Sequence, residues 1–218
     1  MTAGVSGVKM GSGARGVSCR RCPLELYVDG QPRQAAQDRP LGEALELLRR
    51  EAAGAGRAIV TVHLDGRELS PQEEEKLLTE PASALGRVEV QCAPAAEWGR
   101  HGLGEVASAL GQLGDSFRSS AEAFRSNRIG DGLNQANAAV ASYAQVVQAL
   151  VSSVALSGVA PDPGLKAAID GVVNVVRELE KSARASDGVA SADLVEYELP
   201  ERLEALAKLV RGMAETAR

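Results

Sequence analysis

The sequence predicts an α+β protein of two domains, in which a small sheet domain precedes an antiparallel four-helix bundle. Residues 22–93 alternate short β-branched runs with one amphipathic helical segment, whereas apolar residues beyond position 94 recur every three or four positions. Only 3% of the residues are aromatic although 44% are hydrophobic, so Leu, Val and Ala must build the core. This composition favours closely packed helices.

The first half of the sheet domain begins with a hairpin. Apolar and polar side chains alternate over residues 24–28, which predicts a half-buried strand. Asp29 and Gly30 then supply the positive φ angles of a tight turn. We expect a second strand over residues 31–36, where Pro32 indicates the edge of the sheet.

A helix and two further strands complete this domain. Apolar residues between positions 41 and 52 have helical spacing. Residues 58–64 are rich in β-branched side chains, and residues 87–92 alternate, so both predict strands. Between them, Ser70-Pro71-Gln72-Glu73 has the pattern of a capping box that opens a short helix.

The order of these elements over Leu24–Cys92 resembles a ubiquitin-like β-grasp domain. The motif that carries the resemblance is Val62-His63-Leu64-Asp65-Gly66-Arg67-Glu68-Leu69, which is similar to that family's third strand, tight turn and following leucine. The resemblance covers about a third of the chain. It implies partner recognition through an apolar patch on the open sheet face. Here we expect that face to be polar, with Glu25, Tyr27, Thr61, His63, Arg87, Glu89 and Gln91 on it and with Val60 on the opposite, core-facing side.

Four series of apolar residues predict the helices of the bundle. They comprise Leu103, Val106, Leu110, Leu113, Phe117, Ala121 and Phe124; Leu133, Ala136, Val140, Tyr143, Val147, Leu150 and Val154; Leu165, Ile169, Val172, Val176, Leu179 and Ala183; and Leu199, Leu203, Leu206, Val210 and Met213. We expect Asp131 to cap the second helix and residues 93–96 to join the domains. Pro200 should kink the last helical region or split it into two helices.

The hairpin between the first two helices has a second resemblance. Asn127–Asp131, followed by Ala136–Val140, resembles the helical hairpin of the flagellin-export chaperones. That family is an antiparallel bundle that wraps the disordered end of a secreted subunit. The resemblance therefore implies binding of a peptide or protein subunit by the bundle.

The second and third helices carry apolar arcs wider than one seam of a bundle requires. Val146, Val151, Val173 and Val175 lie off the main series, and we predict that they bind a protein partner or a second copy of the chain. The alternative is complete internal burial of both helices, which includes docking of the sheet domain.

Cysteine and histidine residues are the remaining candidates for chemistry. Cys19 and Cys22 form a C-x-x-C pair that could serve thiol redox chemistry or half of a zinc site. A zinc site would need Cys92, His63 or His101 as further ligands, but parallel first and last strands would place Cys92 far from Cys22. We expect unpaired thiols, a linker position for His101, no metal, no cofactor and no catalytic triad.

Charge and composition argue against several classes of function and indicate a cellular location. A net charge of −5 argues against nucleic-acid binding, and we find no run of about 18 apolar residues that would insert into a membrane. Residues 1–21 are Gly- and Ser-rich and predict a disordered tail without a signal peptide. Three cysteines without a secretion signal favour a cytoplasmic protein.

We therefore expect a non-enzymatic adaptor or chaperone-like protein. The first alternative is a ubiquitin-like modifier or sulfur carrier, and the second is a thiol redox or zinc protein that uses Cys19 and Cys22. Conjugation would need a free Gly-Gly after the last strand. The chain instead continues from Cys92 into Ala93-Pro94.

Overall fold

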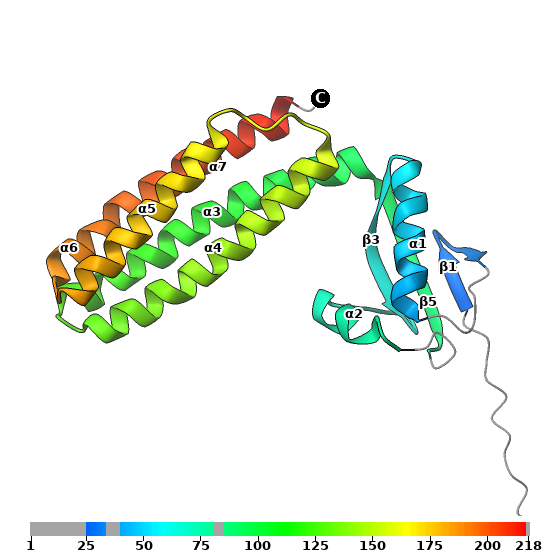
Figure 1. The fold of residues 1–218 in the computed structure, drawn as a ribbon, viewed down its shortest axis with the longest axis horizontal. Helices are drawn as coiled ribbons and strands as arrows, with labels where there is room; N and C mark the ends of the chain where they lie inside the picture. Colours follow the sequence, from blue (N-terminus) through cyan, green and yellow to red (C-terminus); the bar gives the residue numbers. More distant parts are fainter. Residues whose placement is uncertain (1–24, 34–39, 81–84, 217–218) are drawn as a thin grey trace, which may run out of the picture.

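The structure is a computed structural model that describes residues 25–33, 40–80 and 85–216. The fold is α+β, with a five-stranded mixed sheet followed by a mostly helical second half (Figure 1). The elements are β1 (Glu25–Val28), β2 (Gln31–Arg33), α1 (Leu41–Gly54), β3 (Arg57–Leu64), β4 (Arg67–Glu68), α2 (Pro71–Leu77), β5 (Arg87–Pro94), α3 (Ala95–Arg125), α4 (Ile129–Ser157), α5 (Leu165–Arg184), α6 (Gly188–Asp193), a π-helix (Leu194–Glu198) and α7 (Leu199–Thr216).

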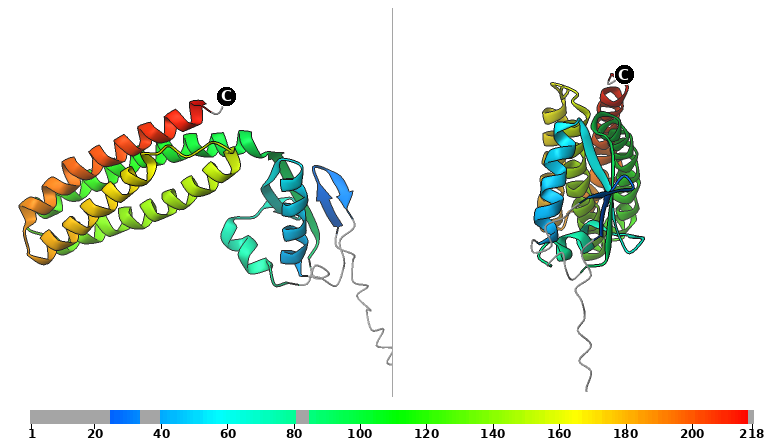
Figure 2. Two further views of the ribbon diagram at one scale, coloured as in Figure 1. Left: turned by 45° about the horizontal axis from the view of Figure 1, so that its top comes forward. Right: turned by 90° about the vertical axis from the view of Figure 1, so that its right-hand side faces the viewer.

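The sheet has the strand order β2-β1-β5-β3-β4, and the pair β1/β5 is parallel whereas the other pairs are antiparallel. Helix α1 covers one face of the sheet (Figures 1 and 2). Its apolar side meets the strands in a small core formed by Leu26, Leu41, Leu45, Leu48, Val62, Leu69, Val88 and Val90. β2 is an edge strand, which confirms the position expected for Pro32.

The β1–β2 turn is tied to the rest of the sheet by Asp29. Asp29 and Gly30 have φ angles of 51° and 76°, as expected for a tight hairpin. The Asp29 carboxylate accepts hydrogen bonds from the Cys92 amide at 2.9 Å and from the Arg57 guanidinium at 2.7 Å. The bond from the Cys92 amide is the main reason that the pKa of Asp29 lies below its usual value.

Strand β3 contains an irregularity that overturns one expectation. The register with β5 shifts between Ile59 and Thr61, so that Ile59 pairs with Cys92 and Thr61 with Gln91. The extra residue, Val60, reverses the alternation of side chains at this point. Ile59 therefore packs against the small core. The prediction that Val60 faces this core is wrong.

The open face of the sheet is polar, as expected from the sequence. The Arg87 guanidinium lies 4.2 Å from the centre of the Tyr27 ring and pairs with the Glu89 carboxylate at 2.7 Å. His63 lies opposite Glu89 on this face but is half-buried rather than exposed. Tyr27, Arg87 and Glu89 contact one another on this face, whereas the Thr61 hydroxyl oxygen and the His63 Nδ1 have no hydrogen-bond partner among the described residues.

Helix α2 begins with the predicted capping box. Ser70 is the N-cap, its hydroxyl accepts from the Glu73 amide, and Glu73 accepts from the Ser70 amide at 3.0 Å. Arg67 also donates to the Glu73 carboxylate at 2.8 Å. The amide of Ser70 is the main cause, and the Arg67 side chain the second, of a fall in the pKa of Glu73 to about 2.

We expect Arg67→Ala and Ser70→Ala each to raise the pKa of Glu73, Arg67→Ala by more, because each removes a hydrogen bond to its carboxylate. The folded pKa lies below the unfolded one. The carboxylate therefore contributes stability above about pH 4.5, and this contribution is lost as the pH falls towards 2. A carboxyl carbon NMR titration measures the shift. Identical titration curves in wild type and both variants would contradict the structure.

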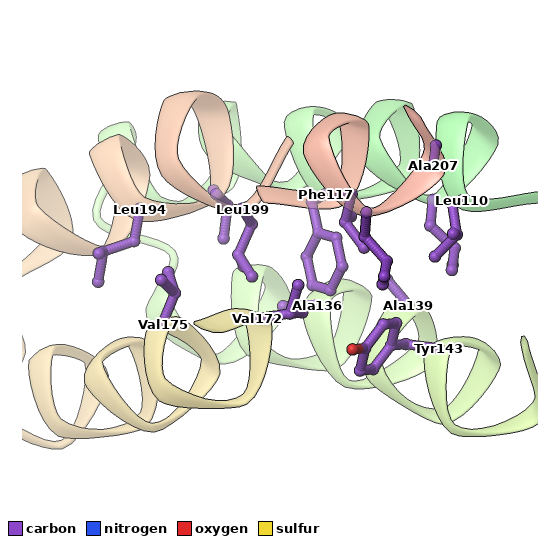
Figure 3. Packing of buried hydrophobic residues seen from close by; sticks show 14 of the residues in the cluster. Leu110, Phe117, Ala136, Ala139, Tyr143, Val172, Val175, Leu194, Leu199 and Ala207 are labelled. Carbon is purple, nitrogen blue, oxygen red and sulfur yellow. The ribbon is translucent and has the colours of Figure 1, made fainter. Parts of the chain in front are cut away.

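The helical half begins without a linker. β5 ends at Pro94 and α3 starts at Ala95, within the predicted joint and earlier than the first residue of the apolar series. The four long helices lie side by side, and the sheet lies beyond one end of them (Figures 1 and 2). Their shared core includes Leu110, Phe117, Ala139, Tyr143, Val172, Val175 and Leu199 (Figure 3).

Two helix ends differ from the expectations. Asp131 does not cap α4, because the helix begins at Ile129 and Arg128 is its N-cap; Asp131 lies in the first turn and pairs with Arg128 at 3.2 Å. Before Pro200, the chain forms α6 and then a π-helix, so the predicted split occurs as a change of helix type. The π-helix changes the pattern of backbone hydrogen bonds just before Pro200, which has no amide hydrogen to donate.

Candidate functional site

Helix α4 presents two apolar stripes, each with alternating steps of three and four residues. The first stripe comprises Gly132, Ala136, Ala139, Tyr143, Val146, Leu150, Ser153 and Ser157. The second stripe comprises Leu133, Asn137, Val140, Ala144, Val147, Val151 and Val154. A helix with one such stripe has a seam for one neighbouring helix, so α4 has seams for two.

The first stripe packs against α3. All its residues except the half-buried Val146 are buried. At the end near the sheet the two backbones almost touch, because a Cβ placed on Gly99 would lie 2.2 Å from the amide nitrogen of Ser157. One on Gly102 would lie 2.4 Å from the Ser153 hydroxyl oxygen. These glycines allow α3 to fill one seam of α4 along its length.

No residue of the second stripe is buried. Asn137, Ala144 and Val151 are exposed, and the other members are half-buried. Val151, in the last third of α4, has 57% of its surface exposed. The half-buried members Leu133, Val140, Val147 and Val154 pack against the core of the bundle, but α4 makes few contacts with α5, so its second seam is only partly filled.

Helix α5 flanks the open seam. Its buried side, which includes Val172 and Val175, meets the shared core, whereas Ile169, Val173 and Val176 are half-buried. The prediction that Val175 lies off the core stripe is wrong, because only 5% of its surface is exposed. The buried side of α5 faces mainly α7, with α6 and the π-helix as further neighbours.

The four predicted partner-binding residues therefore do not form one surface. Val151 is exposed on the second stripe of α4, and Val173 is half-buried on α5. Val146 lies on the first stripe, where it packs against the core, and Val175 is inside the core. The apolar series predicted for this helix, from Leu133 to Val154, contains residues of both α4 stripes. Reading the two series separately would have identified the second stripe.

Helix α4 also lacks charge. No Asp, Glu, Lys, Arg or His occurs between Asp131 and Asp162. By length and composition alone, α4 would be long and apolar enough to cross a membrane, and 22% of its most apolar window is buried. A single helix of this kind is a weak indication of a membrane span, since core helices of soluble proteins also meet these criteria. The apolar, uncharged surface of α4 is nevertheless larger than its contact with α3.

A buried hydroxyl lies beside the open seam. Tyr143 has 6% of its surface exposed, and its hydroxyl has no hydrogen-bond partner among the described residues. Burial, and secondly the charge of Asp170 on α5, raise the pKa of Tyr143 to about 12. The phenol is therefore neutral at physiological pH and offers a proton for a hydrogen bond.

An apolar groove of about 1040 Å³ lies between the loop after α4 and the last turns of α7. Leu209 and Met213 line it, and Lys208 and Asp162 are its ionisable groups. Asp162 accepts a hydrogen bond from the Gly164 amide at 2.6 Å, which assigns it to the loop structure. Apart from Lys208, Asp162 and Thr216, the side chains that line the groove are apolar.

The described candidates Cys92, His63 and His101 are not grouped with one another. Burial is the main reason that the pKa of the Cys92 thiol is raised, so the thiol is less reactive than an exposed one. His101 is on α3 rather than in a linker, 5.8 Å from the Trp98 ring. Cys19 and Cys22 lie outside the described residues. Within the described part of the chain, no three His, Cys, Asp or Glu side chains are grouped to hold a metal ion.

Comparison with family models, curated proteins and solved structures gives no match for this chain.

Proposed function

We propose that the protein is a non-enzymatic adaptor or chaperone-like protein that binds a helix of a protein partner through α4. The observation that carries this proposal is the second stripe of α4. It repeats every three and four residues, contains no charge and is not buried, although the first stripe of the same helix is packed against α3. An amphipathic partner helix fits a seam with this spacing.

The surroundings of the seam support a helix as the ligand. Val173 and Val176 of α5 are half-buried and extend the apolar surface beyond α4. Apolar contacts would supply most of the affinity, at roughly 25 cal/mol per Å² of apolar surface removed from water.

The same proposal includes the finer fold. We place the second half among antiparallel four-helix bundles and the first half among ubiquitin-like β-grasp domains. The parallel pairing of β1 with β5 and the position of α1 on one sheet face support the latter. A modifier or sulfur-carrier role receives less support, because β5 continues directly into α3 and leaves no free tail after the last strand.

We also place the protein in the cytoplasm, with α4 as an interaction helix rather than a membrane span. The close approach of α4 to Gly99 and Gly102 supports this choice, because it commits a full stripe of α4 to α3. A membrane span would have to part from α3, because α3 carries charged residues such as Asp115, Arg118 and Glu122 that are costly inside a bilayer.

Charge on the second stripe tests the proposal. We expect Val151→Lys to leave the melting temperature within about 2 °C of wild type, since the site is exposed, and to abolish partner capture by the full-length chain. The matched control is Val189→Lys on α6, where 72% of the valine surface is exposed. Quantitative mass spectrometry of proteins captured from the source cells compares the three baits.

A third variant separates surface from core. Val175→Lys places a charge in the core and should lower the melting temperature strongly, because a buried ammonium has no partner there. The proposal predicts proteins that wild type and Val189→Lys retain and Val151→Lys loses. Equal capture by wild type, Val151→Lys and Val189→Lys would contradict a partner site on α4.

A further inference from the structure

We infer that the second stripe of α4 pairs with the second stripe of another copy of this chain, in an antiparallel contact about a two-fold axis near Ala144. This inference rests on the proposed function, because it names the partner helix of the same seam. Three properties of the stripe bear on this contact: its lack of charge, the symmetry of its side-chain sizes and its length.

The absence of charge favours a second copy. A surface that selects a different protein usually carries charges that attract the right partner and repel wrong ones. Two copies of one helix bring identical side chains together, so charges near the axis would face their own kind. α4 has no charged residue between Asp131 and Asp162, and its second stripe can meet itself without such repulsion.

The order of side-chain sizes along the stripe is nearly palindromic. With the axis at Ala144, Val140 faces Val147 of the copy and Leu133 faces Val154 of the copy. The smallest side chain therefore lies at the crossing point and the larger ones lie on both sides. A two-fold interface requires self-complementarity of this kind. Small residues at the crossing also permit a short distance between helix axes.

One pair departs from the symmetry. Asn137 faces Val151 of the copy, so a polar amide meets an apolar side chain at two places in the dimer. Both residues are exposed, and the amide can keep its hydrogen bonds to water at the rim of the contact.

The extent of the stripe sets the expected strength. From Leu133 to Val154 the helix rises about 32 Å at about 1.5 Å per residue. One helix face of this length is smaller than the roughly 800 Å² per partner of a standard interface. The half-buried valines of α5 add to the area only at its margin. The dimer is therefore weak and depends on protein concentration.

Analytical ultracentrifugation of the purified full-length chain at concentrations up to about 500 µM tests the inference, because weak contacts dimerise only at high concentration. We expect a monomer–dimer equilibrium in the wild type. Ala144→Arg places two guanidinium groups at the axis and should raise the dissociation constant at least tenfold, since like charges in an interface cost several kcal/mol.

The matched control is Ala149→Arg. Ala149 is also an exposed alanine of α4 but lies on the opposite side of the helix from the second stripe. We expect its dissociation constant to stay within about twofold of wild type, because exposed substitutions away from a contact have small effects. Equal weakening by both arginines, or a wild-type monomer at the highest concentration, would overturn the inference.

Thiol cross-linking supplies a readout that does not depend on charge. In a background in which Cys19, Cys22 and Cys92 are replaced by Ser, Ala144→Cys should form a covalent dimer under mild oxidation through the introduced thiols, because a two-fold axis brings these positions together. Ala149→Cys should not. Cross-linking of both to the same extent would also overturn the inference. If the chain is monomeric while Val151→Lys still loses its captured partner, the self-association fails and the proposed function stands.

Discussion

Phe117→Ala should lower the free energy of unfolding by about 3–5 kcal/mol, the cost of removing a large side chain from a closely packed core. Phe117 is fully buried in the middle of α3 and lies among side chains from the neighbouring helices (Figure 3). Only two phenylalanines occur in the chain, so small aliphatic neighbours cannot fill the space that its ring leaves.

Urea unfolding followed by far-ultraviolet circular dichroism measures this loss. The control is Tyr197→Ala, an aromatic residue in the π-helix with 60% of its surface exposed. Its substitution should change the free energy of unfolding by no more than about 0.5 kcal/mol. Similar losses in both variants would show that Phe117 does not occupy the core position described here.

Gly99→Ala should destabilise the protein by about 1–3 kcal/mol, although alanine favours helices more than glycine does. The new methyl carbon would lie 2.2 Å from the Ser157 amide nitrogen, so α3 and α4 must move apart where they approach most closely. Backbone atoms cannot rotate away as a flexible side chain would. The loss of stability therefore comes from loosening the whole contact between α3 and α4.

The control for Gly99 is another glycine of the same helix. A Cβ on Gly104 meets no atom within 4 Å, so Gly104→Ala should stabilise the protein by about 0.5–1 kcal/mol through helix propensity alone. The fluorescence of Trp98, beside Gly99, follows the unfolding of this region. Stabilisation by both alanines would contradict the close approach of the two helices.

Features set by a few adjacent residues could be predicted from the sequence. The capping box of Ser70 and Glu73 and the turn at Asp29-Gly30 follow from the chemistry of those residues themselves. The apolar series of α3 and α7 were also predicted correctly, because each of these helices buries one well-defined side.

Features set by distant parts of the chain could not be predicted. The extra residue at Val60 exists only because β3 must pair with β5, and nothing in residues 57–64 marks it. Likewise, the burial of Val175 and the exposure of Val151 depend on where α7 and α3 lie. Periodicity identified both helices as apolar on more than one side, but only the tertiary arrangement tells which side is covered.

The joint between β5 and α3 has a mechanical consequence. The Ala95 amide donates to the Gly56 carbonyl at 2.9 Å, and the Arg57 guanidinium donates to the Cys92 carbonyl at 2.6 Å, so both sides of the joint are clamped to the start of β3. A strand that becomes a helix at the next residue leaves no slack for swivelling. A rotation of the sheet would therefore be transmitted directly to α3, and it would change the α3–α4 contact at Gly99.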